Sequence, residues 1–334
     1  MTTIKDVAKK AGVSVATVSH VINKTRLVSD ELILRVNKAI KELDYSPNLM
    51  AGSLRNRRTN TIGLIIPENN NQYFADLATE IENISFLSGF SVMISYSAYD
   101  HKKELEYINV LRSKKVDGLI IVPTTDNSTH INKLVSTGVP VVVANRVLED
   151  IDTDLVMLDY KKGMMDATKH LIGLGHKHIA YLDRPYRLLH SIHRMNGYKQ
   201  ALKDFGIGFD PNLVIKSTFG IKGGVLAVDD FLKINPLPTS LVCFNDLLAV
   251  GVIWEMNRRG VKIPEDISIV GFDNIQFSAY TIPPMTTVHS SRKRMAQKAF
   301  LLLKERISNE INRKNKKIIL EPKLIVREST CHVK

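Results

Sequence analysis

The sequence predicts a small all-α domain followed by a larger, two-lobed α/β domain. Three observations lead to this fold class. The first sixty residues carry short apolar stripes with helical spacing and a large share of the positive charge. From residue 61 onward, apolar runs typical of buried strands alternate with helical stretches. The 334 residues are enough for two or three domains with a sizeable core.

The composition is that of an ordinary globular protein. Apolar residues make up 44% of the chain and charged residues 24%. The two cysteines, Cys243 and Cys331, are too few for a disulfide framework or a cysteine-based zinc site. The sequence has neither an apolar run of about 18 residues nor a secretory signal. We therefore expect a cytoplasmic protein that does not contact membranes.

The positive charge is concentrated at the N-terminus. The chain carries a net charge of +12, and residues 1–60 hold 11 Lys and Arg against 5 Asp and Glu. A compact basic module is the electrostatic pattern expected of a nucleic-acid-binding domain. Charge alone does not separate this interpretation from a merely basic, soluble surface.

Two short helices open the chain. Apolar residues at i, i+3, i+4 and i+7 predict the first one: Ile4, Val7, Ala8 and Ala11. Gly12 allows a turn, Ser14 can cap a second helix, and the apolar stripe of that helix is Val18, Val21 and Ile22. This is a helix-turn-helix pattern, although the spacing alone would also fit an ordinary helical hairpin.

The outward side of the second helix favours DNA binding. Its side chains are small, polar or methyl-bearing, so that the helix fits into a major groove: Val15, Ala16, Thr17, Ser19 and His20. Hydroxyl and imidazole groups can bond to phosphates or base edges, and methyl groups can contact thymine. A third helix follows Ser29, with the core stripe Leu32, Val36, Ala39, Ile40 and Leu43.

The segment after the third helix is predicted to form a helix that is stable only against a partner. It starts at Ser46 and Pro47, spans about two turns and contains Gly52, so it is marginal in water. Arg55, Arg57 and Arg58 follow and suit phosphate contact.

The remaining chain alternates strands and helices. The expected strands are 61–67, 91–96, 116–123, 139–144, 178–183, 240–244 and 267–272. The expected helices include 76–88, 102–113, 163–174, 194–205, 223–232, 246–259 and 292–308. About 270 residues of this kind predict two parallel α/β lobes, with a ligand at the carboxyl ends of the strands.

Candidate ligand-binding residues follow these strands, open a helix (Arg194) or lie in a loop (Phe219): Tyr73, Phe74, Asn145, Arg146, Arg194, Phe219, Asn245, Asp246 and Asp273. Amide, carboxylate and guanidinium groups over an apolar floor suit a polyol or a nucleobase. Asp246 fits the N-cap of its helix equally well, and Tyr73, Phe74 and Phe219 also fit plain core positions.

The sequence gives little support for an enzyme or for a metal-binding protein. The sequence lacks a P-loop, a dinucleotide fingerprint, a nucleophile elbow and a zincin motif. The histidine pairs 176/178 and 190/193 have no further ligand at helpful spacing, so we expect neither a metal site nor a cofactor. A catalytic triad is not visible in a sequence, because its members need not be close in the chain.

The N-terminal motifs resemble the LacI/GalR family of bacterial repressors, above all its purine and ribose repressors. The resemblance rests on residues 3–8, 12–14, 17–24 (TVSHVINK) and 45–48 (YSPN). It implies a DNA-reading helix and an apolar wedge, Leu54, that enters the minor groove and bends the duplex. The DNA-contacting residues expected are Thr3, Val15, Ala16, Thr17, Ser19, His20, Asn23, Leu54 and Arg55.

The resemblance extends over nearly the whole chain and implies three parts: a headpiece at 1–46, a hinge helix and linker at 47–60, and a periplasmic-binding-protein-like effector and dimerisation domain at 61–334. It implies a homodimer on a palindromic double-stranded operator, regulated by a small-molecule effector through the geometry of the hinge.

Three departures from the family pattern bear on the effector. Asp183-Arg184 replaces a common Gly, His190 stands where Ser is usual, and Arg146 takes the place of a purine-stacking Trp. They favour a sugar or sugar phosphate over a purine. A solute-binding protein for uptake or a sugar-processing enzyme remains the alternative, although neither explains the headpiece.

Overall fold

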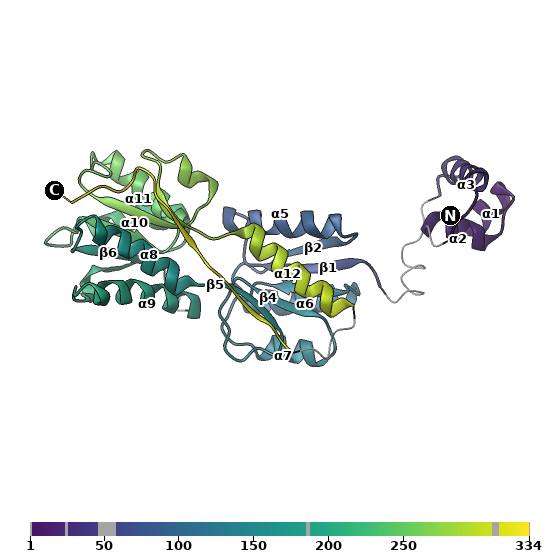
Figure 1. Cartoon of the computed structure of the whole chain (residues 1–334), viewed down its shortest axis with the longest axis horizontal. Coiled ribbons are helices and arrows are strands. Elements are labelled where there is room, and N and C mark those ends of the chain that lie inside the picture. Colours follow the sequence, from purple (N-terminus) through teal and green to yellow (C-terminus); the bar gives the residue numbers. More distant parts are fainter. Residues whose placement is uncertain (1, 24–25, 46–57, 185–187, 309–313, 334) are drawn as a thin grey trace. The chain divides into compact units, whose positions relative to one another are not determined.

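The computed structural model describes residues 2–23, 26–45, 58–184, 188–308 and 314–333. The chain divides into two compact units, Met1–Thr59 and Asn60–Lys334 (Figure 1). Most of the predicted hinge segment 47–60, including Leu54 and Arg55, lies outside the described residues. Within the described residues, the helices are too short or too polar to span a membrane.

The N-terminal unit is a three-helix domain, with α1 (Ile4–Ala11), α2 (Val15–Asn23) and α3 (Asp30–Glu42). Its core is formed by Val7, Ala8, Ala11, Val18, Val36 and Ala39. Gly12 has a φ of +64° and ends α1, and the Arg35 guanidinium ties α3 to the end of α1 by donating to the carbonyl of Ala11. The Ser14 hydroxyl accepts from the backbone N–H of Thr17, so the predicted cap of α2 is confirmed.

One lobe of the second unit is built on a six-stranded parallel sheet in the order β11-β5-β4-β3-β1-β2. Its strands are β1 (Thr61–Ile66), β2 (Ser91–Tyr96), β3 (Gly118–Ile121), β4 (Val141–Ala144), β5 (Asp154–Leu158) and β11 (Lys317–Leu320). Its helices are α5 (Gln72–Leu87), α6 (His101–Ser113), α7 (Thr129–Ser136) and α12 (Arg292–Ile307). Helix α12 packs beside α5, as Figure 1 shows.

The other lobe has a second six-stranded sheet in the order β12-β10-β9-β8-β6-β7, parallel except for β12. Its strands are β6 (Ile179–Asp183), β7 (Val214–Lys216), β8 (Ser240–Cys243), β9 (Ser268–Asp273), β10 (Thr286–His289) and β12 (Lys323–Ile325). Its helices are α8 (Tyr160–Gly173), α9 (Leu189–Asp204), α10 (Gly220–Phe231) and α11 (Asp246–Arg258), with short 3-10 turns η1 (Pro211–Leu213) and η2 (Gln276–Ala279).

The chain passes between the two lobes three times. It crosses from β5 to α8, returns from β10 to α12, and crosses again from β11 to β12. The last crossing is the yellow segment that runs along both lobes in Figure 1. Asp159 therefore lies in the first connection between the lobes, and Ser290 lies in the second.

The predicted strands are all present, but several helices start earlier than expected. Helix α5 begins at Gln72 rather than 76, α8 at Tyr160 rather than 163, and α9 at Leu189 rather than 194. The first turns of these helices carry polar and aromatic side chains that line a cavity. These turns therefore lack the apolar stripe from which the helices were predicted. Helix α7 and strands β5, β7, β10, β11 and β12 were not predicted, because they are short and several carry polar or charged side chains.

Candidate functional site

A cavity of about 290 Å³ opens where strands from both lobes end. Its walls come from the segments that follow β1, β4, β6, β8 and β9, which is the ligand position expected for parallel α/β sheets. Eight of the nine residues predicted to bind a ligand line this cavity: Tyr73, Phe74, Asn145, Arg146, Arg194, Phe219, Asn245 and Asp273.

The ninth predicted residue, Asp246, does not line the cavity. Its buried carboxylate accepts from the backbone N–H of Ile275 at 2.8 Å and from the Thr287 hydroxyl at 2.6 Å. It is not the N-cap of α11 either, because Asn245 holds that position and accepts from the N–H of Leu248. Burial raises the pKa of Asp246 well above its usual range. Asp246 thus holds the loop that follows β9, the strand that ends at Asp273.

Three buried arginines line the cavity, with exposures of 3% for Arg146, 7% for Arg184 and 4% for Arg194. Arg146 donates to the carbonyls of Pro123 and Asn145. Each of the three arginines has one buried nitrogen, Nη2 or Nε, without a hydrogen-bond partner among the described residues. Such unsatisfied donors are costly in a protein interior.

Aromatic rings hold two of these guanidinium groups. The Cζ atom of Arg194 lies 4.2 Å from the ring centroids of both Phe244 and Phe272. The Cζ atom of Arg184 lies 4.8 Å from the ring centroid of Phe219. Cation–π contacts of this kind keep a positive charge in a dry site without neutralising it. Burial, together with the nearby charge of Arg146, lowers the pKa of Arg184 to about 10, and Arg184 therefore stays protonated at neutral pH.

Two further groups set the charge of the cavity. Burial raises the pKa of Asp273 to about 6, although Arg194 opposes the shift from 3.5 Å away. His190 is fully buried near the three arginines, and burial and their charge hold its pKa well below its usual value. Its Nε2 accepts from Nη1 of Arg184 at 3.2 Å, so its Nδ1 carries the proton and is a donor.

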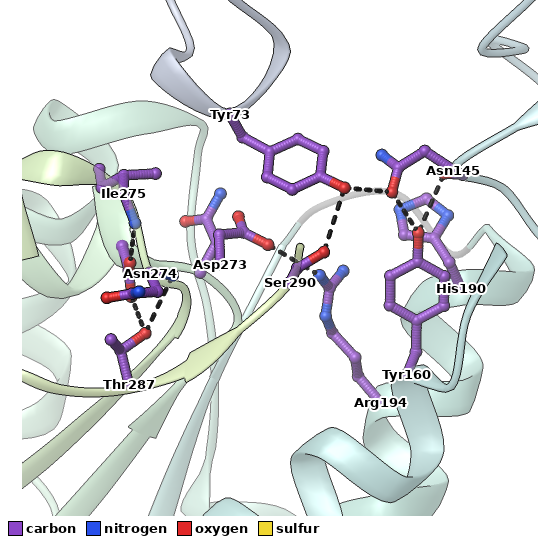
Figure 2. Close-up of polar contacts among 12 residues, drawn as sticks. Tyr73, Asn145, Tyr160, His190, Arg194, Asp273, Asn274, Ile275, Thr287 and Ser290 are labelled. Atoms are coloured by element: carbon purple, nitrogen blue, oxygen red, sulfur yellow. Dashed lines mark hydrogen bonds and ion pairs between the residues drawn. The ribbon is translucent and has the colours of Figure 1, made fainter. Parts of the chain in front are cut away.

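A hydrogen-bonded network connects the cavity wall to the connections between the lobes (Figure 2). The hydroxyls of Tyr73 and Tyr160 both donate to Oδ1 of Asn145 at 2.8 Å. The Tyr73 hydroxyl also lies 3.1 Å from the Ser290 hydroxyl. Tyr160 opens α8 and Ser290 precedes α12, so two of the three crossings meet cavity residues in this network.

The sequence analysis missed several cavity residues, among them Tyr99, Tyr160, Arg184 and His190. Two of these, Arg184 and His190, were noticed as departures from the family pattern but were not assigned to the site. Most of the other cavity residues are far from Arg184 and His190 in the chain, so sequence position did not indicate that these residues meet. The departures themselves were the signal that could have found them.

The N-terminal unit presents the predicted reading helix on its surface. Val15 and Ala16 are exposed, and Thr17, Ser19 and His20 are half-buried on α2. Asn23 is the last residue of this helix. Thr3 is exposed and donates through its hydroxyl and its N–H to the carboxylate of Asp6 at the start of α1.

Comparison with known proteins places both units in one family. Residues 3–48 match the bacterial regulatory proteins of the lacI family, and residues 59–326 match the periplasmic binding proteins and sugar binding domain of LacI family. The chain belongs to the LacI family. It is a DNA-binding transcription regulator controlled by an effector, and the predictions of fold class and of a non-enzymatic regulator are confirmed.

Relatives cover this LacI-family chain from end to end. It is 37% identical to the transcriptional regulator DegA of Bacillus subtilis, with 98% of each chain covered. It is 36% identical to the transcriptional repressor PurR of Aliivibrio fischeri, with 99% of each chain covered. The structure of the lac repressor dimer bound to operator and the anti-inducer ONPF matches with a TM-score of 0.88 at 25% identity, covering 99% of each chain.

Proposed function

We propose that this LacI-family regulator is a homodimeric repressor whose effector is an anionic sugar, bearing a phosphate or a carboxylate. The three buried arginines of the cavity support this proposal above all other observations. Guanidinium groups bind phosphate and carboxylate through paired donors.

The remaining polar groups suit the hydroxyls of the sugar. Asp273 and Asn145 supply acceptors, and aromatic rings provide apolar faces for the sugar ring. A purine is disfavoured because Arg146, a cation, occupies the position that stacks on the base in purine repressors.

Calorimetry with the full-length protein tests the effector class. The panel contains glucose 6-phosphate, ribose 5-phosphate, glucuronate and galacturonate, the neutral sugars glucose, ribose and galactose, and the purines guanine and hypoxanthine. We expect at least one anionic sugar to bind more than tenfold tighter than its neutral parent. Tighter binding of a purine or of a neutral sugar than of every anionic sugar would overturn the proposal.

DNA binding is assigned to α2 and to the segment that contains Leu54. Side chains from the start and the outer side of α2 enter the major groove, and Leu54 enters the central minor groove of a palindromic operator. Because chromosomal DNA is the partner, we place the protein in the bacterial cytoplasm. A gel-shift assay with the DNA upstream of the gene tests this, since the chain without residues 1–60 should lose binding.

Exposed apolar side chains support the homodimer. Helix α5 and its neighbouring edge strand β2 expose Phe86, Leu87, Met93, Ile94 and Tyr96, with Leu87 85% exposed. Helix α11 and the segment at η2 expose Trp254, Phe277, Tyr280 and Ile282. Apolar surface of this kind marks an interface between proteins. Sedimentation of Leu87→Lys should show a shift from dimer to monomer.

The network at Asn145 supplies the proposed switch. A ligand that contacts Asn145 or Tyr73 acts on hydrogen bonds that extend to Ser290 and Tyr160 at the lobe crossings. Such a ligand shifts the lobe arrangement only through its different affinity for the two arrangements. The sequence predicts a marginal helix in the hinge segment, and a helix of that kind would respond to a small change in spacing.

A further inference from the structure

Three potential metal ligands meet beside the effector cavity. His101 and Glu104 lie in the first turn of α6, and His130 lies at the start of α7. One ring nitrogen of each histidine and a carboxylate oxygen of Glu104 all lie within 4.8 Å of one another. The sequence analysis expected no metal site, because it did not pair His101 and His130, which belong to different helices.

The environment of Glu104 resembles that of a built metal ligand. The side chain is 0% exposed, its Oε1 lies 2.7 Å from Nε2 of His130, and its Oε2 accepts from the N–H of Thr124 at 2.7 Å. The backbone donor fixes one carboxylate oxygen and leaves the other directed at the histidines. Metal-ligating carboxylates are commonly held in this way by a second hydrogen bond.

His101 adds an unsatisfied group. Its Nδ1 is buried and has no hydrogen-bond partner within the described part of the chain. Its ring packs edge-to-face on that of His130, with 4.6 Å between the ring centroids. An ion pair between Glu104 and His130 accounts for those two residues alone. It does not account for a second, partly buried imidazole that contributes a nitrogen to the same group.

We propose that His101, Glu104 and His130 bind a divalent transition metal ion, with Zn²⁺ the best match. Two histidines and one glutamate form a ligand set that Zn²⁺ uses, with a fourth position left for water. Tetrahedral bonds of about 2.0–2.1 Å place ligand atoms about 3.3 Å apart. The ligand atoms now lie between 2.7 Å and at most 4.8 Å apart, a range that includes this value.

The site contacts the effector cavity on two sides. Tyr99, which lines the cavity, is two residues before His101. Thr124, which holds Glu104, follows Pro123, whose carbonyl accepts from Arg146. A bound metal therefore fixes one segment of the cavity wall, next to Tyr99, and the segment whose carbonyl holds Arg146. If the proposed effector function holds, metal and anionic sugar affect each other's affinity by the same factor.

Metal titration of the full-length protein tests the site. After removal of metal with a chelator, Co²⁺ should give the visible absorption of a four-coordinate ion at one equivalent per chain, and Zn²⁺ should displace it. His130→Gln and His101→Asn should each weaken Zn²⁺ binding at least tenfold, measured by competition with a chromogenic chelator. His178→Gln is the matched control, since His178 lies in the other lobe and bonds to the Pro236 carbonyl.

The variants also guard against misfolding. His101→Asn removes a side chain whose Nδ1 lacks a partner, so its metal-free thermal midpoint should match that of the unaltered protein. Equal Zn²⁺ affinity in His101→Asn and in the His178→Gln control would overturn the site, as would the absence of Co²⁺ or Zn²⁺ binding by the unaltered chain at micromolar concentration.

Repeating the sugar panel with and without Zn²⁺ separates the two proposals. We expect Zn²⁺ to change the affinity of the anionic sugar at least threefold, and this change to disappear in His101→Asn. An unchanged affinity would remove the coupling but leave the metal site. Metal binding by a protein that binds no anionic sugar would overturn the effector proposal alone.

Discussion

Replacing Arg184 with Gln gives the sharpest test of the cavity's preference for anions. Arg184 is 7% exposed, and its guanidinium lies over the ring of Phe219 and carries a buried Nε without a partner among the described residues. Gln removes the charge but retains the aliphatic stem and a polar N–H group. The substitution therefore changes the charge of the site more than its packing.

The magnitude follows from the hydrogen bonds that are lost. A hydrogen bond to a charged group contributes about 1.5–3 kcal/mol, and every 1.4 kcal/mol is a factor of ten in affinity. Low exposure means that solvent screens this interaction little. We expect Arg184→Gln to weaken binding of the anionic sugar about 10- to 150-fold, and binding of its neutral parent less than about threefold.

The assay is calorimetry of the full-length variant with the tightest anionic sugar of the panel and its neutral parent. Arg112→Gln is the control, because Arg112 is an exposed arginine on α6 that does not line the cavity. An equal loss of affinity for both sugars would refute the argument, since it would show that Arg184 shapes the cavity and does not recognise charge.

Three further predictions concern the cavity, the loop below it and the DNA. Because burial raises the pKa of Asp273 to about 6, this residue contributes stability that is present below the pKa of the unfolded chain and is lost as the pH rises through about 6. For the same reason the affinity for glucuronate or galacturonate should rise as the pH falls from 7.5 to 5.5, by at most about tenfold per pH unit, and Asp273→Asn should abolish the dependence. Asp246→Ala leaves the N–H of Ile275 and the hydroxyl of Thr287 without their acceptor. The substitution should therefore lower the free energy of unfolding, measured in urea, by about 2–5 kcal/mol. A loss no larger than that of the exposed control Asp230→Ala would contradict the role assigned to Asp246. Leu54→Ala should weaken operator binding in a gel-shift assay and leave effector affinity unchanged, whereas an equal loss of both would give Leu54 a structural role.

Local patterns were enough to predict the N-terminal unit. The stripe Ile4, Val7, Ala8 and Ala11, the glycine at 12 and the cap at Ser14 lie within a few turns of one another, and each reports its own local structure. The same holds for the apolar runs of β1, β3, β4, β8 and β9, which are buried on both faces.

The sequence also predicted eight of the residues that line the cavity, for a topological reason. Side chains that follow parallel strands gather at one edge of the sheet, so residues such as Asn145 and Asp273 were identified from their position after a strand. The prediction was wrong for Asp246, because adjacent residues at the start of a helix point in different directions. Here Asn245 reaches the cavity and Asp246 points into the protein.

The headpiece, the positions of the buried strands along the chain and the edge of the sheets at which a ligand lies could all be predicted, because each depends on residues close together in the chain. The folded chain was needed to show that Tyr73 meets Ser290, that Arg184 joins the other arginines, and that His101 and Glu104 face His130. Those meetings depend on the path of the chain between two lobes that it crosses three times, and apolar periodicity records whether a residue is buried but not which distant residue it is buried against.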